Sequence, residues 1–260
     1  MNDKGTLYIV GTPIGNLSDF SERAKDVLKS VSLVAAEDTR HSGMLFKKTG
    51  IRAKLISYHE HNKISRAAQI LDHLENIGSV ALVSDAGMPC ISDPGHEIVS
   101  LCAEHGYDIS VIPGPCAAVT AIAGSGFDLS RFVFEGFLPS RGNERKKRIT
   151  QISSCEMTSI LYEAPHRIIK ILSEFRDSAG GERKICIARE MTKKHEEFLH
   201  CTIDDAINHF ETTPPKGEFV IIIEGIGQAK SKKDDIDAAK SINDRSEERR
   251  VGKEGRSRWS

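Results

Sequence analysis

The stretch SVALVSDAGMPCISDPGHE, residues 79–97, decides the fold, because it joins a short apolar run to a loop rich in backbone-shaping residues. The run VALV favours a β-strand buried on both faces, as in a parallel sheet covered by helices. After it come two glycines, two prolines and three acidic residues. Ligands bind to open parallel sheets outside the carboxyl ends of the strands. We therefore predict that this loop forms a wall of a ligand pocket.

The same alternation of strand and helix extends from residue 5 to about residue 125. The short β-rich runs LYIV, LVAA, KLISY, VALVS and ISVIP are separated by stretches with apolar residues near helical spacing. Five such units predict a parallel five-stranded sheet covered by helices. The run CAAVTAIAGSG predicts one more helix after the fifth strand, and a domain boundary follows it.

The second half of the chain has a different pattern. The runs ICIARE and EFLHCTI are separated only by MTKKHE, which is too short for a helical crossover and predicts an antiparallel pair. We therefore expect a mixed sheet. The predicted organisation is α/β, with one domain over residues 1–125, a second over residues 126–226, and a polar tail over residues 227–260.

Charge and composition limit the function. Residues 245–260 carry six Lys or Arg against three Asp or Glu and no apolar period, so we interpret them as a non-native addition; a natural basic tail that binds nucleic acid is the alternative. The rest of the chain is net acidic, so RNA binding would need local cationic patches. We expect no signal peptide, no membrane span, reduced cysteines, no metal site and a cytoplasmic protein.

Three glycine- and proline-rich loops follow the first, fourth and fifth predicted strands: VGTPIGNL, SDAGMPCISDPG and IPGPCAA. None has the glycine spacing of a dinucleotide-binding loop or the lysine of a P-loop, so a dehydrogenase is the least expected function. Glycine would instead let the backbone approach an uncharged part of a ligand. Each loop alone could be an ordinary turn, but three at successive strand ends favour a site.

Charged side chains lie beside these loops. AAEDTRH places Asp38 and Arg40 after the second strand, either at a pocket rim or, for Asp38, as a helix cap. SRGNERKKR could be a solvated helix face or, beside a pocket, a surface that binds phosphates. Its candidate RNA-binding residues are Arg141, Arg145, Lys146, Lys147 and Arg148.

Eight motifs in this order resemble the tetrapyrrole methylase family: GTPIGNL, AAEDTRH, SDAGMPCISDPG, VIPGPCA, FEGFLP, YEAPHR, AREMTK and KGEFV. Within it the chain resembles the branch that methylates the ribose 2′-hydroxyl of a cytidine in 16S rRNA of the small ribosomal subunit. The resemblance spans about residues 5–225. It implies two α/β domains with S-adenosylmethionine (the methyl donor) in the cleft between them, a homodimer, and the small subunit or its RNA as substrate.

The resemblance also implies which residues contact S-adenosylmethionine. DAGMP would wrap its methionine end, Pro13, Gly114 and Ala117 would lie near the sulfur, and the second domain would line the adenosine side. The full set is Pro13, Asp85, Ala86, Gly87, Met88, Pro89, Gly114, Ala117, Tyr162, Ala164, Ala188 and Gly217. For the chemistry we predict Asp38 as base, with Arg40 or Arg189 near the developing alkoxide.

Two other functions remain open at this point. One is a methyltransferase that acts on a tetrapyrrole or another small substrate, and the cationic run at residues 141–148 argues mildly against it. The other is a non-catalytic ribosome-assembly factor that keeps the fold. Members of the branch continue past KGEFV into a helical segment, which here gives way to residues 245–260.

Overall fold

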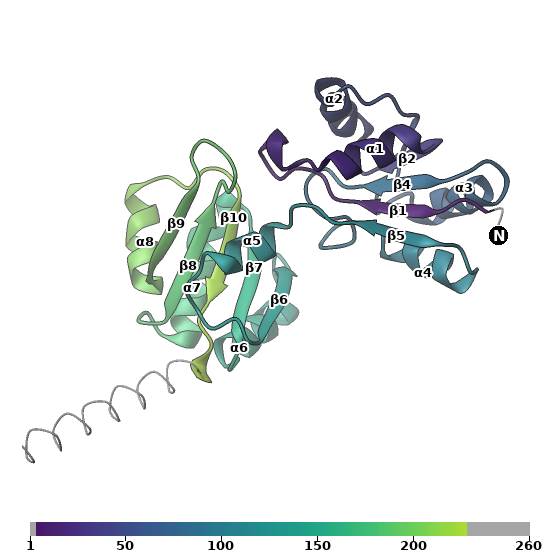
Figure 1. Cartoon of the computed structure of the whole chain (residues 1–260). Coiled ribbons are helices and arrows are strands. Elements are labelled where there is room, and N and C mark those ends of the chain that lie inside the picture. Colours follow the sequence, from purple (N-terminus) through teal and green to yellow (C-terminus); the bar gives the residue numbers. More distant parts are fainter. Residues whose placement is uncertain (1–3, 228–260) are drawn as a thin grey trace, which may run out of the picture.

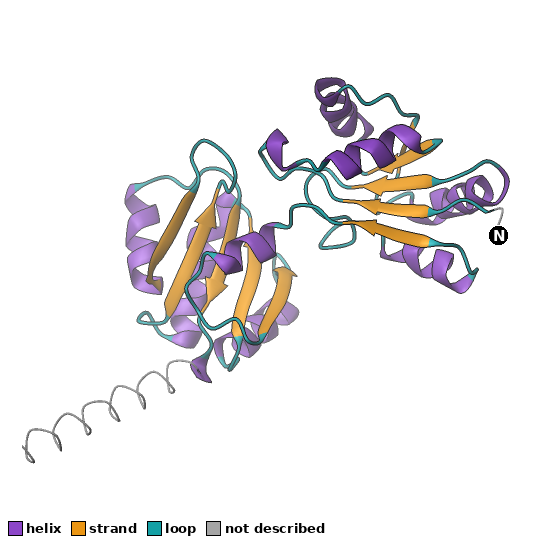
Figure 2. Cartoon of the chain, viewed as in Figure 1, coloured by secondary structure: helices purple, strands orange, loops and turns teal. Residues whose placement is uncertain are grey.

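The computed structural model describes residues 4–227, which form two α/β units joined by a short connection (Figure 1). Each unit is built on its own five-stranded sheet (Figure 2). This confirms the predicted class, two α/β sheets of which the first is parallel and the second mixed.

The first sheet has the strand order β3-β2-β4-β1-β5, and all of its pairings are parallel. Every residue of β2 and β4 is buried, as expected for strands covered on both faces. The strands are β1 (Leu7–Val10), β2 (Leu33–Ala36), β3 (Leu55–Ser57), β4 (Val80–Val83) and β5 (Ile109–Ile112).

Helices cover both faces of this sheet. In β4, Val80 and Leu82 pack in one core with α3 and α4, whereas Ala81 and Val83 pack in the other core with α1 and α2. Alternate side chains of a strand point to opposite faces, which explains the two cores. The helical elements are η1 (Leu17–Asp19, a 3₁₀ turn), α1 (Glu22–Ser30), α2 (Thr39–Thr49), α3 (Lys63–Asn76) and α4 (His96–Glu104).

The second sheet has the order β6-β7-β10-β8-β9. β6 and β7 are parallel, and the other pairings are antiparallel. Lys184 pairs with Thr202 and Arg189 with Glu197, which confirms the antiparallel pair predicted from the short MTKKHE connection. The strands are β6 (Phe132–Phe137), β7 (Thr158–Glu163), β8 (Lys184–Arg189), β9 (Glu197–Thr202) and β10 (Phe219–Ile223).

One face of the second sheet packs against α6, α7 and α8, and fully buried Ile171, Leu172 and Phe175 of α7 lie in that core. Thr202 caps α8 and forms a reciprocal capping box with Asp205. These elements are α6 (Asn143–Ser153), η2 (Pro165–Arg167), α7 (Ile168–Ala179) and α8 (Ile203–Thr212).

The helix α5 (Ala117–Ala123) packs on the other face of the second sheet (Figure 1). Its Ala118, Ala121 and Ile122 share a core with β7, β8 and β10. The sequence pattern placed this helix in the first domain, because it directly follows β5. By its packing it belongs with the second sheet, so we propose a boundary at residues 113–116 rather than 125–126.

The predicted tail at residues 228–260, including the suspected non-native residues 245–260, lies outside the described residues. All six cysteines are free thiols. Within residues 4–227 no helix is both long and apolar enough to cross a membrane, and no group of three or more His, Cys, Asp or Glu is placed to hold a metal ion.

Candidate functional site

Three strand-end loops of the first unit meet because β1 lies between β4 and β5 in the sheet. The loop after β1 is fixed to the loop after β4 by two backbone hydrogen bonds. The N–H of Thr12 donates to the Gly87 carbonyl (2.9 Å), and the N–H of Gly87 donates to the Thr12 carbonyl (3.1 Å). The loops after β1 and β5 touch through glycine backbones, since a Cβ on Gly11 would lie 2.7 Å from Cα of Gly114. The three loops therefore form one continuous wall.

The second unit faces this wall and touches it in two places. A Cβ on Gly15 would lie 2.7 Å from Oγ1 of Thr192, in the loop that follows β8. A Cβ on Gly136, at the irregularity in β6, would lie 3.0 Å from Oγ of Ser92. These contacts bring the second unit against the loops of the first on both sides of a cavity.

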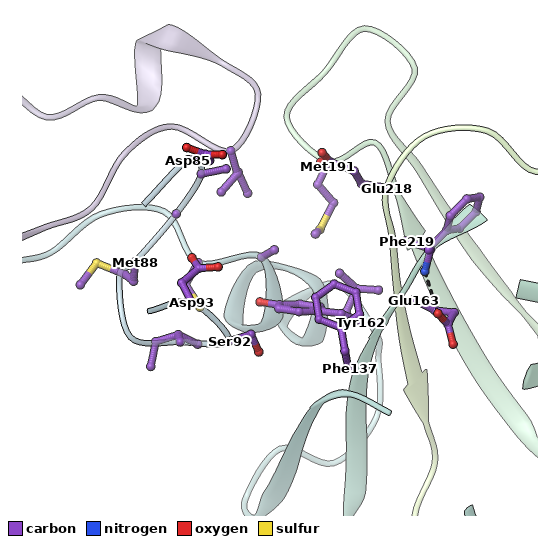
Figure 3. Close-up of a pocket in the computed structure, with 18 of the residues that line it drawn as sticks. Asp85, Met88, Ser92, Asp93, Phe137, Tyr162, Glu163, Met191, Glu218 and Phe219 are labelled. Carbon is purple, nitrogen blue, oxygen red and sulfur yellow. Dashed lines mark hydrogen bonds between the residues drawn. The ribbon is translucent and has the colours of Figure 1, made fainter. Parts of the chain in front are cut away.

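The cavity has a volume of about 440 Å³. In Figure 3, Asp85, Met88, Ser92 and Asp93 come from one side, whereas Phe137, Tyr162, Met191 and Glu218 come from the other. The lining residues are Ile14, Glu37, Asp85, Ala86, Gly87, Met88, Ile91, Ser92, Asp93, Cys116, Ala117, Phe137, Tyr162, Glu163, Ala164, Pro165, Met191, Glu218, Phe219 and Val220.

Tyr162 links the cavity to α5. Its hydroxyl accepts a hydrogen bond from the N–H of Ala118 (3.0 Å), and its ring makes edge-to-face contacts with Phe134 and Phe137. Burial raises the pKa of Tyr162 to about 12. The side chain is therefore neutral at physiological pH and presents a fixed aromatic surface to a ligand.

Acidic side chains dominate the electrostatics of the cavity. Burial, together with the nearby charges of Glu37 and Asp85, raises the pKa of Asp93 to about 6. Burial and the charge of Asp85 also raise the pKa of Glu37. No Lys, Arg or His is among the described residues that line the cavity. A ligand that brings positive charge would relieve the repulsion among these carboxylates.

Most of the predicted cofactor residues lie in the cavity. Its lining includes Asp85, Ala86, Gly87, Met88, Ala117, Tyr162 and Ala164. The others lie close in sequence or packing but do not line it: Pro13, Pro89, Gly114, Ala188 and Gly217. Ala188 is fully buried in the sheet, and Gly114 lines a second, smaller cavity. The cofactor role of all twelve stays a prediction.

Sequence reasoning missed several lining residues, although a signal for them was present. Asp93 lies in the same loop as Gly87, and Met191 directly follows the predicted strand that ends in ARE. Phe137 lies in the motif FEGFLP. Each could have been found by extending the strand-end argument by a few residues.

The predicted catalytic residues do not line the cavity. Asp38 caps α2 by accepting a hydrogen bond from the N–H of Arg40 (2.8 Å), and its carboxylate pairs with the Arg40 guanidinium at 2.7 Å. These hydrogen bonds hold the pKa of Asp38 well below its ordinary value, which makes it a weak base. Arg189 donates to the Lys216 carbonyl and pairs with Glu197. Their catalytic roles stay predictions.

The predicted RNA-binding run divides into two groups. Arg145 is buried, with hydrogen bonds to Glu174 (2.9 Å from Nε) and to the Pro139 carbonyl (2.9 Å). Arg148 donates to the carboxylate and the carbonyl of Glu135. Both side chains make hydrogen bonds within the second unit, and their RNA-binding role stays a prediction. The run therefore presents only Arg141, Lys146 and Lys147 as exposed cations.

Comparison with known proteins points to one family. A family model described as tetrapyrrole (corrin/porphyrin) methylases matches residues 6–207. A Synechocystis sp. protein named ribosomal RNA small subunit methyltransferase I is 46% identical over 221 residues, covering 85% of this chain and 79% of that protein. The Thermotoga maritima protein of the same name is 43% identical over 221 residues, covering 85% of this chain and 99% of that relative.

Solved structures agree on the fold. A cobalt precorrin-4 methyltransferase matches with a TM-score of 0.65 at 19% identity, covering 84% of this chain and 94% of that one. A uroporphyrin-III C-methyl transferase from Thermus thermophilus, complexed with S-adenyl homocysteine, matches with a TM-score of 0.59 at 17% identity, covering 84% and 97%. Because the family model matches residues 6–207 and the relatives align over most of the chain, this protein belongs to the tetrapyrrole (corrin/porphyrin) methylase family.

Proposed function

We propose that the cavity between the two sheets binds S-adenosylmethionine. This ligand carries a positive sulfonium and an ammonium group but no phosphate. The single observation that carries the proposal is the lining itself. It has three carboxylates on one side, aromatic and apolar side chains together with Glu163 and Glu218 on the other, and no cation among the described lining residues. One solved structure of the same fold was crystallised with S-adenyl homocysteine, the demethylated form of the ligand.

The chain's own residues divide the work of binding. Asp85 and Asp93, supported by Glu37, would hold the cationic methionine part, whereas Tyr162 and Phe137 offer aromatic surface to the adenine ring. The bound donor supplies a methyl group already activated by a positively charged sulfur. The protein then has to align an acceptor with that methyl group and exclude water, and alignment can contribute about 7–11 kcal/mol.

For the acceptor, we propose the ribose 2′-hydroxyl of a cytidine in 16S rRNA, within the small ribosomal subunit. Support comes from relatives named ribosomal RNA small subunit methyltransferase I and from the eight motifs of the ribose-methylating branch. The Thermotoga maritima relative has almost no chain beyond the aligned region, so a protein of that name exists without a long extension. We also propose a homodimer, as the resemblance implies.

Methyl transfer from labelled S-adenosylmethionine tests this function against its alternatives. We expect label in small subunits purified from a strain that lacks this enzyme, and none in a tetrapyrrole such as uroporphyrinogen III. Label in the tetrapyrrole alone would favour the small-substrate reading. Binding of the donor with transfer to neither acceptor would favour the non-catalytic assembly factor.

The affinity for S-adenosylmethionine should fall as the pH is lowered from 7 to 5. Asp93, whose pKa is raised to about 6, is mostly ionised at pH 7 and mostly protonated at pH 5. Because the cationic ligand favours the ionised carboxylate, Kd should rise about tenfold over this range, as expected for one coupled proton. Calorimetry at both pH values measures the change.

The matched variant for this measurement is Asp93→Asn, which removes the titrating group. Its affinity should be weaker at pH 7 and should vary much less with pH. Glu37, whose pKa is raised in the same direction, accounts for the remaining dependence. A wild-type Kd that is equal at pH 5 and pH 7 would contradict the acidic-pocket account.

Neutralising the exposed cations Arg141, Lys146 and Lys147 should weaken RNA binding and leave donor affinity unchanged. They lie just after the cavity-lining Phe137. Loss of three phosphate contacts should lower the slope of log affinity against log salt by about 3. Filter binding of 16S rRNA at several salt concentrations measures this slope, with the α2 variant Lys47→Ala/Lys48→Ala as the control. An unchanged slope would mean that this surface does not contact RNA.

A further inference from the structure

A second cavity of about 330 Å³ adjoins the first. It is lined by Ile14, Asp19, Gly114, Pro115, Thr120 and Thr192. Ile14 lines both cavities. Beside Ile14, the backbones of Gly11 and Gly114 are in contact, since a Cβ on Gly114 would lie 2.8 Å from Cα of Gly11. The two cavities therefore adjoin at Ile14.

Asp19 lies at this second cavity, with its backbone held by a turn and its side chain exposed. It ends the 3₁₀ turn η1, which Asn16 caps by accepting a hydrogen bond from the N–H of Ser18 (3.0 Å). The N–H of Asp19 donates to the Asn16 carbonyl, and the next residue, Phe20, is anchored in the core with 2% of its surface exposed. No residue in the described part of the chain forms a hydrogen bond or ion pair with the Asp19 carboxylate. The turn fixes the backbone of Asp19, and its exposed carboxylate is available as an acceptor.

Two hydroxyl groups complete the polar lining. Thr120 projects from α5, where it is exposed. Thr192 has a left-handed backbone (φ 65°), which a β-branched residue rarely adopts, and its buried Oγ1 has no hydrogen-bond partner among residues 4–227. A buried hydroxyl without a partner costs free energy, which a polar ligand would recover only after a shift of the loop exposed this oxygen. The exposed Asp19 carboxylate and Thr120 hydroxyl are groups that suit a sugar.

We propose that this second cavity receives the acceptor ribose and that Asp19 accepts the proton of its 2′-hydroxyl. This inference rests on the proposed function. The hydroxyl oxygen forms a bond to the methyl carbon, the carbon–sulfur bond breaks with its electron pair left on sulfur, and the hydroxyl proton passes to the Asp19 carboxylate. Asp19 thus takes the role that the sequence suggested for Asp38, whose carboxylate is already paired with Arg40.

The first test compares Asp19→Asn with wild type in single-turnover methyl transfer to unmethylated small subunits. Loss of a positioned general base should slow transfer about 10²- to 10⁴-fold. Donor affinity measured by calorimetry should change less than about twofold. The reason is that Asp19 does not line the first cavity, in which we propose that the donor binds. Asp26→Asn, on the exposed side of α1, is the control and should transfer at the wild-type rate.

The second test measures binding without catalysis. With S-adenosylhomocysteine bound, wild type should prefer unmethylated over methylated small subunits by about tenfold, because a methyl ether has no proton to donate to Asp19. Asp19→Ala should lose this preference, whereas Asp26→Ala should keep it.

The outcomes separate the two claims. If wild type transfers methyl groups to RNA and Asp19→Asn does so at the same rate, the assignment of Asp19 is wrong while the proposed function stands. If wild type transfers nothing to RNA, the proposed function fails and the acceptor cavity fails with it. Slow transfer by Asp19→Asn with intact donor affinity, together with loss of subunit preference in Asp19→Ala, supports the assignment.

Discussion

Replacing Gly87 by valine should raise the Kd for S-adenosylmethionine at least about 100-fold, which is two tenfold steps, while the protein stays folded. Gly87 has φ 84°, and an added Cβ would lie 3.3 Å from both Cγ2 of Ile14 and the Pro115 carbonyl oxygen. A β-branched residue at this φ is strained by about 1–3 kcal/mol. Relieving the strain would move the loop that lines the donor cavity and break its hydrogen bonds to Thr12. Calorimetry measures the affinity.

Gly106 provides a matched control for this substitution. It has a similar φ of 70°, but an added Cβ there would meet no atom within 4 Å, and Gly106 does not line the cavity. Gly106→Val should therefore show a similar loss of thermal stability with wild-type donor affinity. If Gly87→Val bound the donor as tightly as wild type, the loop after β4 would not shape the donor site.

Replacing Arg145 by methionine should lower the free energy of unfolding by about 3 kcal/mol, because it breaks a buried ion pair while keeping an apolar stem of similar length. The Arg145 side chain is 3% exposed, and its partner Glu174 is 31% exposed. Glu174 would lose its cation and the Pro139 carbonyl its donor. Chemical denaturation measures the change.

The neighbouring residue Lys146 serves as the control for Arg145, because it is exposed on the same helix. Lys146→Met should change the free energy of unfolding by less than about 0.5 kcal/mol. At a temperature where both variants are folded, Arg145→Met should keep wild-type donor affinity. A variant of Arg145 with full stability but weak RNA binding would return this side chain to the RNA-binding surface.

Much of the fold could be predicted from the sequence because its signals are local. Runs such as VALV are apolar throughout and short, which fixes strands buried on both faces, and the structure confirms their parallel sheet. The glycines and prolines after β1, β4 and β5 are also a local signal, and they predicted loops that line the cavity. The position of a strand end along the chain was enough to locate them.

What the sequence did not reveal depends on contacts between distant residues. The apolar face of α5, formed by Ala118, Ala121 and Ile122, is compatible with either sheet, so its position after β5 did not show which sheet it covers. The partner of Arg145 lies 29 residues away in α7. Unless that contact is known, the sequence does not distinguish a buried arginine from an exposed RNA-binding arginine in the same cationic run.

The contacts of the candidate catalytic residues were also not visible in the sequence. Asp38 and Arg40 were proposed because they lie beside a strand end, but the side chains pair with each other rather than line the cavity. Asp19, which we propose instead, lies in a short turn beyond the glycine loop, where the strand-end argument does not reach. Only the fold shows that this turn, Thr192 and α5 enclose a common space.

The most direct test of the central claim is mass spectrometry of nucleosides from small subunits methylated by this protein with labelled S-adenosylmethionine. The subunits come from a strain that lacks the enzyme, and their RNA is digested after the reaction. We predict a single labelled product, 2′-O-methylcytidine, in wild type and its loss in Gly87→Val. Label on a base, on a different nucleoside, or on no nucleoside while the donor remains bound would contradict the account.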